Sequence, residues 1–277
     1  MSTDVRATPV HIRPDDGSRA VTQWRVVVSE WVKLRSLRST VWTLGAAVVA
    51  LVTFGLLIAY VRTTQGVASP GPGLGSDDPT ATALAGVTFG QLAIGVLGVL
   101  VVTSEYSTGM IRSTLTAVPR RLSVLVAKAT VFAAVTFTVS LGSVLVAFFG
   151  AQAILERSDL QTTFGTDGVA RAVVGAALYL TAVGLLGMAL GWLLRSTAGA
   201  IAALVATLMV VPVVFGLLPA SWNETVGPYL PGNAGQAVMT VARDGSHLAP
   251  WVGFAVFCGY AAITLAVGAL RLVRRDA

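Results

Sequence analysis

The sequence predicts an all-α integral membrane protein: six transmembrane helices follow an amphipathic interfacial elbow helix, and both termini are cytoplasmic. Of the 277 residues, 55% are hydrophobic and only 12% are charged, against about 25% charged in an average soluble domain. Six long apolar stretches contain no charged residue, and the basic residues gather on one side of them. A soluble globule and a disordered chain are excluded by this composition, and a disulfide scaffold is excluded because Cys258 is the only cysteine.

The six apolar stretches define the expected spans. A helix that crosses the hydrocarbon core of a bilayer needs about 20 largely apolar residues, and the chain meets this length at about 41–61, 82–103, 129–153, 172–194, 198–219 and 250–270. A seventh charge-free stretch, 225–242, contains two prolines and three glycines. A regular helix facing lipid does not tolerate that composition. We therefore expect residues 220–249 to form an outer loop that holds a short re-entrant or interfacial helix.

The distribution of basic residues predicts the orientation. With the N-terminus inside, 15 of the 19 basic residues fall in cytoplasmic segments, as expected for loops held on that side. The net charge of +6 has the same explanation, so no nucleic-acid partner is expected. Residues 1–20 are expected to be a mobile cytoplasmic tail and not a signal peptide, because the first apolar run begins only near Val41. The skew toward arginine, alanine and glycine suggests a bacterial protein of the plasma (inner) membrane.

Residues 21–38 are expected to form the elbow helix. At 100° per residue, one face carries the apolar side chains of Trp24, Val27, Val28, Trp31 and Leu34, and the opposite face carries Arg25, Ser29, Lys33 and Ser36. Arg35 and Arg38 add positive charge at its end. A basic amphipathic helix that leads into a span suits the cytoplasmic membrane interface. It is either a positive anchor that fixes the orientation or an elbow that transmits force into the first span.

The segment between the second and third spans, 104–122, is expected to be a cytoplasmic loop. Glu105 follows the last apolar turn of the span. Ile111 and Leu115 lie four residues apart, on one face of a short helix that must end before Pro119. Three arginines, Arg112, Arg120 and Arg121, make the segment basic. Such a loop either docks into a cleft on a soluble partner or is a solvated linker.

Several motifs are missing from the sequence. A phosphate-binding loop needs glycine directly before its lysine, whereas the only two lysines follow Val32 and Ala127. No charged residue lies well inside the six apolar stretches, which disfavours a secondary transporter driven by ions. His11 and His247 have no metal-ligand neighbours at suitable spacing, so a membrane enzyme or scaffold is the weakest of the three function classes. No cofactor or metal is expected in this chain.

Two further features concern packing. Gln91 is a polar residue in the second span, and we expect it to bond a neighbouring helix and not a substrate. The glycine pairs Gly86 with Gly90 and Gly187 with Gly191 allow helices to approach closely. We expect these pairs to pack inside one chain.

Two stretches resemble one family. The elbow Ser29-Glu-Trp-Val-Lys-Leu-Arg-Ser-Leu-Arg-Ser-Thr-Val-Trp42 and the pattern Glu105-(x)3-Gly109…Leu115…Pro119-Arg120-Arg121 are similar to the permease subunit of type-2 ATP-binding-cassette exporters, the actinobacterial branch above all. The likeness covers nearly the whole chain. Many relatives have threonine after the glycine where this chain has Met110, a departure that concerns the docking contacts.

The resemblance implies a channel half that works as a homodimer or heterodimer. A separate cytoplasmic nucleotide-binding ATPase, which binds the ATP and magnesium, would drive it, so this chain itself is not expected to be an enzyme. By position, the residues in or beside the ATPase-coupling helix would be Glu105, Gly109, Ile111, Arg112, Leu115, Pro119, Arg120 and Arg121, and those of the elbow Trp24, Trp31, Lys33, Arg35 and Arg38. A stand-alone secondary transporter or channel is the alternative.

Overall fold

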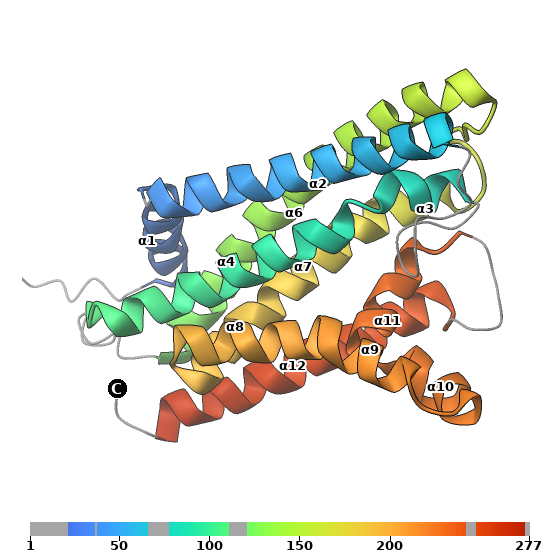
Figure 1. Ribbon diagram of the computed structural model, residues 1–277. Helices are drawn as coiled ribbons and strands as arrows, with labels where there is room; N and C mark the ends of the chain where they lie inside the picture. Colours follow the sequence, from blue (N-terminus) through green and yellow to red (C-terminus); the bar gives the residue numbers. More distant parts are fainter. Residues whose placement is uncertain (1–21, 37, 66–77, 111–120, 242–247, 275–277) are drawn as a thin grey trace, which may run out of the picture.

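The computed structural model describes residues 22–36, 38–65, 78–110, 121–241 and 248–274 (Figure 1). The expected N-terminal tail, 1–20, lies outside the described residues. Within the described ranges every regular element is helical, and the helices are α1 Gln23–Ser36, α2 Arg38–Gln65, α3 Pro79–Leu84, α4 Val87–Ser107, α6 Arg121–Leu155, α7 Val169–Leu194, α8 Thr197–Val205, α9 Val211–Gly216, α10 Ala220–Val226, α11 Pro231–Gln236 and α12 Pro250–Arg274.

The prediction of six spans is confirmed. Among the described residues, six helical stretches are long and apolar enough to cross a membrane: Arg38–Thr64, Pro79–Ser107, Leu122–Ser158, Val169–Leu194, Thr197–Gly216 and Pro250–Leu272. Most extend past the expected apolar limits, because polar residues at a span's end are compatible with helix even where they do not favour lipid. The chain is therefore a multi-pass membrane protein.

The fourth span, α7, is the centre of the bundle. In α7, 78% of the apolar window is buried inside the protein, against 17% in the fifth span and 22% in the sixth. It contacts α4, α6 and α12 (Figure 1). Large apolar side chains on the outer helices, such as Val49, Phe149, Val213 and Ile263, are exposed. An apolar outer surface of this extent suits a lipid environment and not water.

Glycines bring α4 and α7 into backbone contact. A Cβ atom on Gly98 would lie 2.0 Å from the carbonyl oxygen of Gly184, and one on Gly187 would lie 2.2 Å from that of Gly95. Gly86 approaches the backbone of α2 in the same way, with 1.9 Å between its ideal Cβ position and the Leu51 oxygen. The prediction that the glycine pairs pack inside one chain is confirmed, since small residues let helix backbones meet.

The fifth span is not a regular helix. Between α8 and α9, residues Ala206–Val210 form a π-helical turn that ends two residues before Pro212. Proline has no N–H and its ring clashes with the carbonyl four residues earlier, here that of Leu208. A π turn widens the helix at this point. Gly232 of α11 lies against the Leu208 carbonyl, 3.0 Å from oxygen to ideal Cβ position.

Residues 220–241 are more ordered than a loop. They contain α10 and α11 with 3-10 turns after each, and Leu230, Gly235 and Val238 are buried. From α7, the Arg171 guanidinium donates to the carbonyl oxygens of Val238 (2.8 Å) and Thr240 (2.9 Å). Irregular backbone thus finds its partners inside the protein, as a membrane requires.

Gln91 forms a hydrogen bond to a neighbouring helix. The hydroxyl of Tyr179 in α7 donates to Gln91 Oε1 in α4, with an O–O distance of 2.5 Å. Both side chains are buried. Gln91 therefore bonds a neighbouring helix, which confirms the prediction.

Candidate functional site

The helix α1 lies across the ends of the spans and makes a sharp angle with α2 (Figure 1). Only residue 37 separates Ser36, the end of α1, from Arg38, the start of α2. Val26 of α1 is buried and packs with Val124 and Ala127 near the start of α6. This small apolar contact holds α1 against the bundle and directs the next buried turn of α1 toward α4 and α6.

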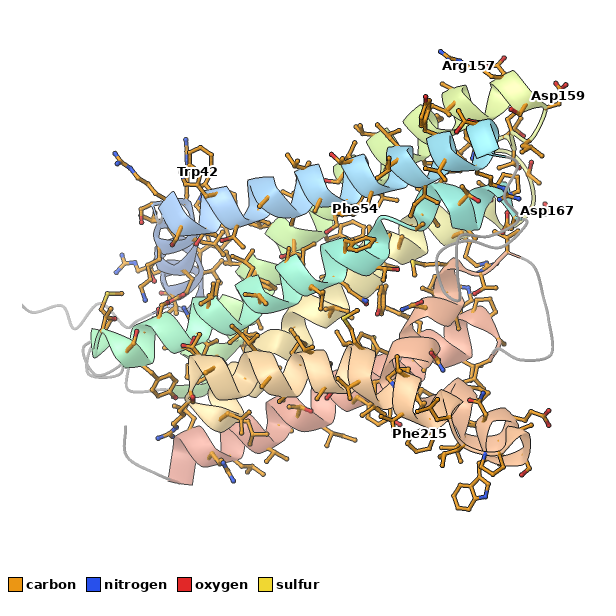
Figure 2. The ribbon with its side chains drawn as sticks, viewed as in Figure 1. Trp42, Phe54, Arg157, Asp159, Asp167 and Phe215 are labelled. Carbon is orange, nitrogen blue, oxygen red and sulfur yellow. The ribbon has the colours of Figure 1, made fainter. Side chains whose placement is uncertain are left out.

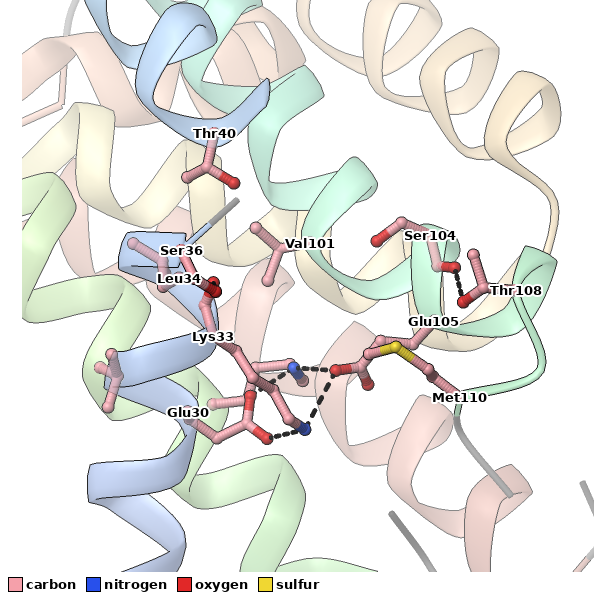
Figure 3. Close-up of a pocket in the computed structure, with 12 residues that line it drawn as sticks. Glu30, Lys33, Leu34, Ser36, Thr40, Val101, Ser104, Glu105, Thr108 and Met110 are labelled. Atoms are coloured by element: carbon pink, nitrogen blue, oxygen red, sulfur yellow. Dashed lines mark hydrogen bonds and ion pairs between the residues drawn. The ribbon is translucent and has the colours of Figure 1, made fainter. Parts of the chain in front are cut away.

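Four charged side chains from three helices meet there, and we call them the ion cluster: Glu30 and Lys33 of α1, Glu105 of α4 and Lys128 of α6 (Figure 3). Lys128 Nζ lies 2.5 Å from Glu30 Oε2 and 2.8 Å from Glu105 Oε1. Lys33 Nζ lies 2.8 Å from Glu30 Oε1 and 3.4 Å from Glu105 Oε1. Each ammonium group therefore contacts both carboxylates.

The ion cluster is buried and electrically balanced. The side chains of Glu30, Lys128 and Glu105 are 3%, 4% and 6% exposed, whereas that of Lys33 is 29% exposed. A buried charge is tolerated only when it is paired and hydrogen-bonded. Two carboxylates and two ammonium groups meet this condition together, so removing any one leaves an uncompensated charge.

The ion cluster raises the pKa of the Lys33 ammonium group. Burial alone would lower the pKa of its ammonium group, but the hydrogen bond to Glu30 and the negative charges of Glu105 and Glu30 outweigh burial and raise the pKa above the ordinary 10.5. Opposite charges nearby favour the charged form. Lys33 therefore stays protonated at neutral pH.

This shift predicts how the contribution of Lys33 to stability depends on pH. Because the folded pKa is raised, that contribution is fully present below the unfolded value of 10.5 and is lost as the pH rises through the folded pKa. We expect the difference in thermal unfolding midpoint between the parent and Lys33→Met to be constant from about pH 7 to about pH 9.5 and to shrink above about pH 10.5. A difference that grew with alkaline pH would contradict this assignment.

The polar face of α1 turns toward the bundle at Lys33. Lys33 was expected on the face opposite the tryptophans, and it points toward α4 and α6 and joins the ion cluster. The apolar side chains of Trp24 and Trp31 point outward, at 70% and 47% exposed. A helical wheel ranks faces by polarity alone and does not include the charges that α4 and α6 supply to the buried side.

The structure corrects the position of Glu105. It was expected on a loop spanning 104–122, but α4 continues to Ser107, and Glu105 is buried in its last turns. Gly109 follows the C-cap residue Thr108, and its φ of +72° lies in the left-handed region. Glycine is favoured there because it has no Cβ penalty. On the other side, α6 begins at Arg121, so Lys128 lies inside a long helix.

The remaining predicted site residues are not part of the ion cluster. Five of them lie outside the described residues: Ile111, Arg112, Leu115, Pro119 and Arg120. Arg121 is the first residue of α6, and Arg35 and Arg38 are exposed. The structure thus brings Lys33 and Glu105 together with two residues that were not predicted, Glu30 and Lys128.

A signal for Glu30 and Lys128 existed in the sequence. Glu30 is the only acidic residue in the segment 21–38, and Lys33 and Lys128 are the only lysines in a chain rich in arginine. Lysine carries a compact point charge on a flexible stem, whereas arginine presents a planar fork of donors. The two lysines and the single acidic residue were therefore exceptional positions, although nothing in the sequence paired them.

Comparisons with known proteins do not assign a family. A scan against protein-family models finds no matching family, and a search of the curated proteins finds no match. Within the ranges that the structure describes, no three histidine, cysteine, aspartate or glutamate side chains are grouped so that they could hold a metal ion. The function must therefore be argued from the ion cluster and its position.

Proposed function

We propose that the chain is the permease subunit of an ATP-driven exporter that works as a dimer with a separate cytoplasmic ATPase. The observation that carries this proposal is the ion cluster. It ties α4 and α6, the two helices that flank residues 108–120, to α1, which leads into α2. A force applied to this connection would move the first three spans as a unit.

In this mechanism, ATP closes two cytoplasmic ATPase subunits, which pull on residues 108–120 and on α1. The spans tilt from inward-facing to outward-facing, and hydrolysis resets them. The ATP and magnesium are held by the partner, and this chain binds neither. The exposed Trp24 and Trp31 would lie in the headgroup region of the plasma membrane, since tryptophan favours that interface. Both termini would be cytoplasmic.

The alternative is a stand-alone secondary transporter or channel. Its best support is the pair of buried carboxylates, Glu30 and Glu105, because transporters use such groups as proton relays. Two lysines balance these carboxylates, and each lysine contacts both carboxylates. That arrangement is typical of a structural ion cluster more than of a site that exchanges protons in each cycle.

The docking prediction tests the proposal. Ile111→Asp combined with Leu115→Asp places two carboxylates where apolar side chains are expected to enter a cleft of the ATPase. Unpaired carboxylates in such a cleft would cost several kcal/mol. We expect normal membrane insertion but loss of co-purification with the partner ATPase.

The matched control is Leu160→Asp, which adds a carboxylate at an exposed apolar residue between the third and fourth spans. This variant should insert and retain the ATPase. If the double variant bound the ATPase as tightly as the parent, residues 108–120 would be a solvated linker. The coupling role would then fall to α1 around Trp31 and Lys33.

A further inference from the structure

The corner between α1 and α2 carries the same pair of residue types on both of its arms. Trp31 and Arg35 are four residues apart at the end of α1, and Arg38 and Trp42 are four residues apart at the start of α2. Side chains at this spacing are neighbours on one face of a helix. All four residues are exposed, and Trp42 lies beside the meeting of the two helices (Figure 2). We call these four residues the corner patch.

The two arginines of the corner patch have no partner inside the described part of the protein. Among the described residues, no carboxylate, carbonyl oxygen or aromatic ring pairs with Arg35 or Arg38. Arginines elsewhere at this end of the bundle differ, because Arg195 donates to the carbonyl oxygen of Arg271, and Arg271 donates to that of Leu193. The corner patch thus presents two positive charges that these parts of the chain do not neutralise.

The acidic residues of the described ranges do not compensate this charge. Glu30 and Glu105, the acids at this end of the bundle, are buried and already balanced by the two lysines of the ion cluster. Asp159 and Asp167 lie at the opposite end from Trp42 (Figure 2). The corner patch is therefore basic as a whole, and it attracts anions.

The combination of arginine with tryptophan indicates which anion fits. Guanidinium groups bind phosphate oxygens through charge-assisted hydrogen bonds. The Cα atoms of Arg35 and Arg38 are at most about 11 Å apart, since each residue advances the chain by no more than about 3.8 Å, so both side chains can reach one phosphate. Tryptophan favours the headgroup region of a bilayer. A soluble anion would leave the exposed rings of Trp31 and Trp42 in water, whereas a phospholipid contacts them.

We propose that the corner patch binds one anionic phospholipid from the surrounding leaflet. The phosphate group accepts hydrogen bonds from Arg35 and Arg38, and the glycerol and first methylene groups contact Trp31 and Trp42. The bound lipid holds α1, and with it half of the ion cluster, at the membrane surface. The site needs only this chain and a lipid, so it depends neither on transport nor on the ATPase.

The test is native mass spectrometry of the full chain in detergent micelles, which counts bound lipids. The probes are palmitoyl-oleoyl phosphatidylglycerol, which is anionic, and phosphatidylcholine with the same acyl chains, which is zwitterionic. Each basic side chain near an anionic lipid strengthens binding about fivefold. We therefore expect the first phosphatidylglycerol to bind about thirtyfold more tightly than phosphatidylcholine. The double variant Arg35→Gln with Arg38→Gln should lose this preference, and each single variant should lose about fivefold.

The matched control is Arg157→Gln, which removes an exposed arginine at the opposite end of the bundle (Figure 2) and should leave lipid binding unchanged. Equal affinity of the parent for both lipids would overturn the site, and so would unchanged binding of phosphatidylglycerol in the double variant. A double variant that lost the partner ATPase and still bound phosphatidylglycerol like the parent would assign the corner patch to protein docking instead.

Discussion

Lys128→Met is expected to lower the free energy of unfolding by about 3 to 5 kcal/mol, the usual cost of removing one partner of a buried ion pair. Methionine retains much of the apolar stem, so the loss comes from the charge. Glu30 would then keep only Lys33, and Glu105 would keep only the longer contact of 3.4 Å to Lys33. The measurement is unfolding by titration with sodium dodecyl sulfate in mixed micelles.

A double variant and a control separate charge from packing. In Lys128→Met with Glu105→Gln, one negative charge is removed along with the positive one, so part of the lost stability should return, as a coupling energy in a double-mutant cycle. Arg25→Met on the exposed side of α1 should change stability by less than about 0.5 kcal/mol. A Lys128→Met protein as stable as the parent would show that the ion cluster contributes nothing.

Gly98→Ala is expected to destabilise the bundle by about 3 kcal/mol, the upper part of the range for overpacking. The added methyl group would lie 2.0 Å from the Gly184 carbonyl oxygen. That neighbour is backbone of the central helix and cannot turn aside as a side chain can. To accommodate the methyl group, α4 and α7 would have to separate along their contact, with loss of dispersion contacts on both sides.

Matched glycines in other spans provide the control. Gly142 in α6 and Gly259 in α12 have open space at their Cβ positions, with no atom within 4 Å. Gly142→Ala and Gly259→Ala should therefore leave stability unchanged or slightly raised, since alanine is the better helix former. Equal losses for Gly98→Ala and Gly142→Ala would contradict the close α4–α7 contact.

The number of spans was predictable because the thickness of the hydrocarbon core fixes the length and the apolar composition of each spanning helix. Both properties can be read directly from the sequence. The packing of the glycine pairs inside the chain followed from the size of glycine, and the bond of Gln91 to a neighbouring helix followed from its polarity. The partner itself, Tyr179, was not predicted. The start of α6 at Arg121 was not predictable in this way. Helices continue past the hydrocarbon wherever capping and tertiary contacts permit, and charge-free windows do not detect that extension.

The ion cluster was only half predicted, for a related reason. Lys33 was predicted as a residue of the elbow and Glu105 as a residue of the coupling loop. Their contact was not predicted, because they are 72 positions apart in the sequence. Lys128 and Glu30 are 98 positions apart. Polarity patterns along one helix place such residues on solvated faces, because a single sequence window does not include the opposite charge that makes burial tolerable.

We propose that ATP used by a separate subunit moves the spans through the ion cluster. The most direct test measures the distance between spin labels at Arg157→Cys, just beyond α6 (Figure 2), and Trp222→Cys in α10, in a Cys258→Ala background. Labelled chains are diluted with unlabelled ones in proteoliposomes. We expect ATP with magnesium to shift this distance only when the ATPase is present, and we expect Lys128→Met to abolish the shift. A shift that follows an imposed pH gradient without the ATPase would contradict the proposed coupling.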